Sequence, residues 1–127
     1  GMSANTVNTP RAPNPVTFVG GIGSPMGWHF SAPMGRLAFD EQRLVISGVG
    51  PAATAGTVDM LRQEVAAVRL STGVLAVRVS VIDLNGNALV PFFTAVSRRR
   101  IRMALRDRTW VVEDTYLLRQ KRLWTGP

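Results

Sequence analysis

The chain has 127 residues, which is the usual size of one domain with a single hydrophobic core. Its apolar fraction of 46% and charged fraction of 18% are typical of globular proteins, and the absence of cysteine excludes disulfides, thiol nucleophiles and thiolate metal sites. No stretch contains the roughly 18 consecutive apolar residues that span a bilayer, and no signal-peptide pattern opens the chain. The composition therefore predicts a cytoplasmic protein, with membrane association as the alternative.

The net charge of +7 is concentrated near the C-terminus. From Ser97 onward nine basic residues stand against three acidic ones, whereas the preceding residues carry six against five. Such a surface is suited to nucleic acid, anionic lipid or an acidic protein face. Fourteen of the fifteen basic residues are arginine, as a GC-rich genome would give, so a solvated arginine face is the simpler interpretation.

Proline and small polar residues dominate the start of the chain, which predicts an extended or disordered arm over residues 1–27. Gly1 is interpreted as a remnant of tag removal. The only apolar run, at 16–19, predicts one short strand within the arm. The glycine-rich residues 20–23 are spaced like part of a phosphate-binding loop, but Pro25 follows where a helix would have to begin, so this interpretation is disfavoured.

Strand signals begin near residue 28. Alternating apolar residues at 36–40 and 43–47, joined by a polar turn, predict a hairpin. A loop rich in glycine and alanine separates this hairpin from a brief strand at 58–61, and the context of residues 63–71 favours a further strand.

The clearest predicted strand is 75–82, where apolar residues alternate with others at period two. Asn85 and Gly86 then predict a two-residue type I′ hairpin turn, because both tolerate positive φ. In that register Val79 faces Phe92.

Ser97 is a good N-cap, and Ile101 and Leu105 recur at the spacing of one helical face. These residues predict a helix over 97–107 whose narrow apolar stripe docks on the rest of the domain. Residues 113–127 are interpreted as a basic C-terminal tail.

The order of these elements resembles the bacterial pleckstrin-homology-like (PH-like) domains over residues 28–112. The resemblance rests on the spacing of apolar residues at 36–39, 44–48, 64–68, 77–79, 92–93, 101–105 and 110–111. It implies a mainly β fold with one C-terminal α-helix, in which two near-orthogonal antiparallel sheets of seven strands form a half-open barrel capped by the helix. It also implies a binding or scaffolding role without catalysis.

In eukaryotic pleckstrin homology domains, clustered basic residues around the first hairpin give phosphoinositide specificity. The corresponding hairpin here has Arg36 and Arg43 flanking Asp40 and Glu41. Two carboxylates at the tip would repel a phosphate, so the resemblance transfers no binding residue.

Residues suited to catalysis or metal binding are sparse. His29 is the only histidine, and its place between Trp28 and Phe30 favours a packed or surface residue over a general base. The scattered carboxylates have no metal-ligand spacing. We therefore predict no enzymatic activity, no cofactor and no metal.

The candidate contact for an anion or a partner lies on the predicted helix. Arg98, Arg102 and Arg106 recur at i, i+4 and i+8 and form a ridge about 12 Å long, with Arg99 beside it. Such a ridge can neutralise phosphates without reading sequence.

Three functions follow from this sequence. The first is a non-enzymatic PH-like module that acts through protein contacts or self-assembly as a homo-oligomer. The second is peripheral binding to anionic membrane lipid through the arginine-rich helix and tail. The third, less favoured, is nonspecific binding to nucleic acid.

Overall fold

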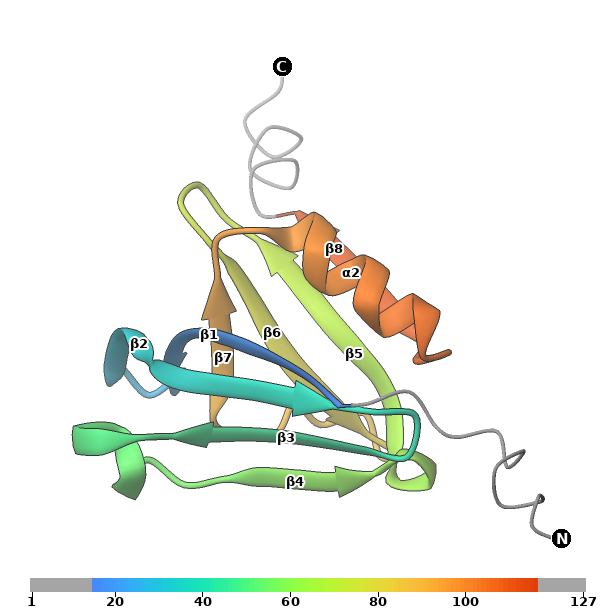
Figure 1. The fold of residues 1–127 in the computed structure, drawn as a ribbon, viewed down its shortest axis with the longest axis horizontal. Coiled ribbons are helices and arrows are strands. Elements are labelled where there is room, and N and C mark those ends of the chain that lie inside the picture. The colour runs from blue at the N-terminus through green and yellow to red at the C-terminus, as the bar shows by residue number, and fades with distance from the viewer. Residues whose placement is uncertain (1–14, 117–127) are drawn as a thin grey trace, which may run out of the picture.

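The structure is a computed structural model that describes residues 15–116. Within this range the protein is mainly β with a single α-helix near its C-terminal end, as the sequence predicts (Figure 1). The strands are β1 (Val16–Gly23), β2 (His29–Phe39), β3 (Arg43–Gly48), β4 (Val58–Leu61), β5 (Val65–Thr72), β6 (Val77–Asp83), β7 (Phe92–Ala95) and β8 (Val112–Tyr116), and the helix is α2 (Arg98–Asp107).

The eight strands form one sheet in the order β4-β3-β2-β1-β7-β6-β5-β8. Strand β1 pairs with β2 on one side and with β7 on the other, so the hydrogen bonding continues through the middle of the sheet. The two sheets expected from the sequence are therefore one continuous sheet, and it is not closed into a barrel, because β4 and β8 form its ends. In Figure 1, β2, β3 and β4 run across the view while β5 and β6 run obliquely to them.

Strand β1 lies at the centre of the sheet. The expectation of an extended arm over residues 1–27 is wrong for this segment, and the short strand predicted at 16–19 continues to Gly23. Its glycine-rich half is buried because side-chain and backbone atoms of β2 and β7 lie close to the glycines, and Ile22 is fully buried in the core. Residues 1–14 of the predicted arm lie outside the described range.

The predicted hairpin at 36–47 is confirmed as the paired ends of β2 and β3, with Phe39 opposite Leu44. The Asp40 carboxylate accepts hydrogen bonds from the backbone N–H groups of Gln42 (2.7 Å) and Arg43 (3.0 Å). These bonds stabilise the turn, because the carboxylate accepts hydrogen bonds from backbone N–H groups in the turn, as aspartate side chains commonly do.

The turn between β6 and β7 is longer than predicted. The Asp83 N–H donates to the Asn87 carbonyl (2.9 Å), so three residues rather than two close the loop. Gly86 has a φ of 86° in this loop, a conformation that glycine adopts without steric cost.

The register of β7 is shifted from the predicted one by a separate irregularity, because residues 89–91, between the Ile82–Ala88 bridge and β7, displace the pairing by two residues. Val79 faces Phe93 rather than Phe92. Because side chains alternate between faces, the shift places Phe93 in the core and Phe92 on the outer face of the sheet.

The helix follows the prediction. The Ser97 hydroxyl accepts a hydrogen bond from the backbone N–H of Arg100 (3.3 Å), and Ile101 and Leu105 are buried against the sheet. After the helix, buried Trp110 donates its indole N–H to the Asp40 carbonyl (2.7 Å) and joins this end of the chain to the β2–β3 turn.

The expected tail begins with a strand. Residues 112–116 form β8, which pairs in parallel with β5, Val68 lying opposite Val112 and Thr72 opposite Tyr116. The predicted tail boundary at residue 113 is therefore wrong for residues 113–116, and residues 117–127 lie outside the described range.

Candidate functional site

The predicted arginine ridge does not lie free in solvent along its whole length. Arg98 donates from Nη1 to Oδ1 of Asp114 (2.9 Å), and Arg102 donates from Nε to Oδ2 of the same carboxylate (3.0 Å). Asp114 comes from β8, which lies beside α2 at the end of the sheet (Figure 1). Two of the four predicted contact residues therefore hold β8 against the helix.

The other two predicted residues differ from this pair. Arg99 and Arg106 are exposed, whereas Arg98 is half-buried and also lies over the Tyr116 ring, 4.9 Å from its centroid. The helix thus presents a smaller free positive surface than the spacing alone suggests.

Polar contacts tie β8 to β5 as well. Arg69 pairs with Glu113, and the Thr115 hydroxyl donates to the Ser71 hydroxyl (3.0 Å). These contacts lie on the outer face, opposite the core, because Val68 and Leu70 alternate with them and are fully buried.

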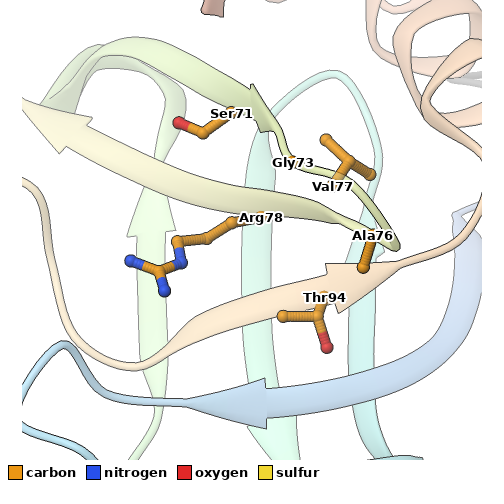
Figure 2. Close-up of a pocket in the computed structure, with 6 residues that line it drawn as sticks. All are labelled: Ser71, Gly73, Ala76, Val77, Arg78 and Thr94. Atoms are coloured by element: carbon orange, nitrogen blue, oxygen red, sulfur yellow. The ribbon is translucent and has the colours of Figure 1, made fainter. Parts of the chain in front are cut away.

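A polar row that the sequence did not single out crosses the outer face of the sheet. Pairing places Thr115 beside Ser71, Ser71 beside Arg78, and Arg78 beside Thr94, on four neighbouring strands. Figure 2 shows the last three side chains on β5, β6 and β7. We call Ser71, Arg78, Thr94 and Thr115 the outer polar row.

The row ends at β1, where a glycine is required. An added Cβ at Gly21 would meet the Thr94 hydroxyl and lie 2.8 Å from the Phe30 carbonyl and 3.0 Å from Nε2 of His29. The bare backbone lets His29 reach across β1, and its Nε2 lies 3.2 Å from the Thr94 hydroxyl.

Aromatic rings support the centre of the row. The Arg78 guanidinium lies over the Phe92 ring, 3.9 Å from its centroid, and the His29 ring stacks on Phe92 at 6.5 Å. Phe92 is therefore buried although it points away from the core. A guanidinium held flat on a ring keeps its N–H edge available to an anion.

Two shallow pockets adjoin at the row and share Arg78 and Thr94. One, of about 320 Å³, is lined by Ser71, Gly73, Ala76 and Val77 in addition to the shared pair. The other, of about 380 Å³, is lined by Ser24, Pro25, Gly27, Trp28, His29 and Phe92 together with that pair. Volumes of this order suit part of a small molecule.

An apolar tip lies at the end of the β5–β6 hairpin. Val74 and Leu75 are 76% and 87% exposed, and Val96, just after β7, is 90% exposed. Since Val77 pairs with Ala95, the tip and Val96 lie at the same end of the sheet, next to the start of α2. Figure 1 shows this turn beside the connection from β7 to α2.

The described residues include no group of three or more potential metal ligands close enough to hold an ion, and no helix among them has the length and hydropathy of a membrane span. In comparisons with known proteins, the chain matches no family model and no curated protein.

Proposed function

We propose that this protein is a non-enzymatic, PH-like binding module that acts through protein contacts, with a second copy of the same chain as its first partner. The observation that carries the proposal is the open sheet: within residues 15–116, β4 and β8 each have a neighbouring strand on one side only. An unpaired strand edge offers a row of backbone donors and acceptors to another chain.

The order of elements supports the PH-like assignment. Seven strands precede one helix, which is the composition that the resemblance implies. The helix packs Ile101 and Leu105 on the sheet, as a capping helix would.

Strand β8 is the better of the two edges for such a contact. The Val68 N–H donates to the Val111 carbonyl (2.8 Å), so the backbone groups of the next residue, Val112, point away from β5. The backbone groups of Asp114 also point away from β5, because the direction alternates along a strand. The Asp114 side chain is held by its ion pairs to α2. An edge strand that is already held in place by side-chain contacts loses little conformational entropy when a second strand pairs with it.

Sedimentation equilibrium of the full chain tests this proposal. We expect a weight-average mass above 13.8 kDa that rises with concentration. The exposed Thr115→Lys substitution adds a charge on β8, and two such charges meet in a twofold contact, so association should weaken about tenfold. Thr17→Lys, at an exposed position on central strand β1, is the matched control and should leave the association unchanged.

Peripheral binding to anionic membranes is a second candidate, and the apolar tip favours it. Val74, Leu75 and Val96 are exposed apolar side chains that can insert at a lipid interface. The first turn of α2 brings Arg99 and Arg100 to the same end of the sheet. Apolar insertion together with basic residues is the combination that binds anionic bilayers.

Co-sedimentation with phosphatidylcholine vesicles, with and without phosphatidylserine, tests this second candidate. Leu75→Glu should abolish binding to the anionic vesicles, and Arg99→Glu should reduce it. Leu84→Glu is the matched control, because Leu84 is 68% exposed in the turn at the opposite end of β6. Equal binding by the Leu75 and Leu84 variants would contradict the candidate.

A further inference from the structure

We propose that the outer polar row binds the phosphate group of a small organic phosphate, with Arg78 as the central contact. This ligand site lies on the outer face of the sheet and is centred on β6, and it shares only Thr115 with the edge contact proposed above. Among the described residues no carboxylate lies within ion-pair distance of the Arg78 guanidinium, which is also true of Arg99 and Arg106 on α2. Arg78 differs from these two because its guanidinium is held over an aromatic ring, that of Phe92, 3.9 Å from the centroid.

The hydroxyl groups beside Arg78 are able to act as donors. Ser71 accepts a hydrogen bond from Thr115, so its own hydroxyl hydrogen is free to donate to a ligand. When Nε2 of His29 carries the proton and donates to Thr94, the Thr94 hydroxyl is likewise free to donate. Two short chains of hydrogen bonds thus end in donors on the two sides of one guanidinium.

This set of donors fits a phosphate better than a carboxylate. A carboxylate is satisfied by the two parallel N–H groups of a single arginine, whereas a phosphate monoester has three terminal oxygens. The guanidinium can bind two of these oxygens, and the hydroxyls of Ser71 and Thr94, which adjoin Arg78 in the pairing, supply donors for the third.

The surrounding pockets leave room for an organic group. On the side of β1, the pocket of about 380 Å³ contains Trp28, which is 37% exposed, and Pro25. A flat aromatic or heterocyclic ring carried by the phosphate can pack on these apolar surfaces. The site therefore matches an aromatic phosphate monoester better than inorganic phosphate.

A backbone amide NMR titration of the full chain tests the proposal, with inorganic phosphate and phenyl phosphate as probes at constant ionic strength. We expect saturable shifts at Ser71, Arg78 and Thr94, with phenyl phosphate binding more tightly. Arg78→Gln should weaken binding about 10- to 100-fold, since a charged hydrogen bond is lost, and Thr94→Val should weaken it less. Arg99→Gln, which removes an exposed arginine from α2, should have no effect.

Other outcomes would overturn the proposal. Shifts that do not saturate, shifts that are largest on α2, or unchanged affinity in a folded Arg78→Gln variant would each remove the site. Equal affinity for the two probes would remove the organic group. Phosphatidic acid vesicles form a separate arm: binding to these vesicles without binding to phenyl phosphate would exclude a soluble ligand and assign the phosphate to a lipid headgroup.

Discussion

Replacing Asp114 by alanine removes the acceptor that Arg98 and Arg102 share. The Asp114 side chain is 22% exposed and the two arginines are 31% and 37% exposed, so these ion pairs are neither fully solvated nor buried. Exposed pairs contribute about 0.2–1 kcal/mol, and breaking a buried pair costs about 3–5 kcal/mol. For two pairs of intermediate burial we expect a loss of about 1–2 kcal/mol in the free energy of unfolding.

Urea unfolding followed by circular dichroism measures this loss, and Glu113→Ala is the matched control on the same strand. Glu113 is 47% exposed and pairs with one arginine, so its removal should cost less than about 0.5 kcal/mol. The difference between the two variants should shrink in 1 M salt, since screening weakens exposed pairs. If Asp114→Ala were no more destabilising than Glu113→Ala, the anchoring of β8 by α2 would be refuted.

Three further substitutions test the fold. Thr109 has a φ of 64°, which is unfavourable for a β-branched residue, so Thr109→Gly should raise the free energy of unfolding by about 0.5–1 kcal/mol in urea titrations, and a decrease would contradict this. Gly21→Ala would push a methyl group into the Phe30 carbonyl and the Thr94 hydroxyl, so a loss of about 1–3 kcal/mol is expected, and an unchanged melting temperature would show that β2 and β7 can yield. A hydrogen bond from Arg43 holds the pKa of Asp59 below its ordinary value, so the stabilisation it gives is present above the unfolded-state pKa and is lost as pH falls through the folded-state pKa. Asp59→Asn should therefore be less stable than the parent at pH 7, and the difference should shrink as pH falls through the folded-state pKa of Asp59; a difference that did not shrink in acid would contradict this linkage.

The sequence predicted the elements whose side chains are patterned by the core. The alternation of Val77, Val79 and Val81 and the spacing of Ile101 and Leu105 both survive in the structure, because each reflects one face packed against apolar neighbours. The strand predicted at 75–82 begins at Val77 instead, and Leu75 lies exposed in the preceding turn. The type and order of these elements could therefore be predicted from the sequence alone.

Strand β1 was predicted only in its first half and β8 was not predicted, for different physical reasons. The second half of β1 is glycine-rich, and such a composition predicts a loop. The segment is a strand because the glycines allow the neighbouring strands to approach closely, which the composition does not reveal. Strand β8 is mostly polar, and ion pairs stabilise it: Asp114 pairs with arginines of α2, and Glu113 pairs with Arg69 of β5. Such tertiary pairing leaves no local pattern.

For the candidate sites, too, the sequence showed the local patterns but not the contacts that depend on tertiary pairing. The arginines of α2 were visible as a helical repeat, but their ion pairs to Asp114 depend on a strand that the sequence did not predict. Arg78 was visible only as a charged residue in an apolar strand, and its alignment with Ser71 and Thr94 depends on the register of three strands. An arginine at an outward position of an otherwise apolar strand is the signal that could have drawn attention to it.

The mass of the full chain in solution tests the central claim most directly. Sedimentation equilibrium over a wide concentration range should give a weight-average mass that climbs from 13.8 kDa toward twice that value, and Thr115→Lys should move this rise to higher concentration. A mass of 13.8 kDa at every concentration up to about 1 mM, for the parent and the variant alike, would contradict self-association through the β8 edge.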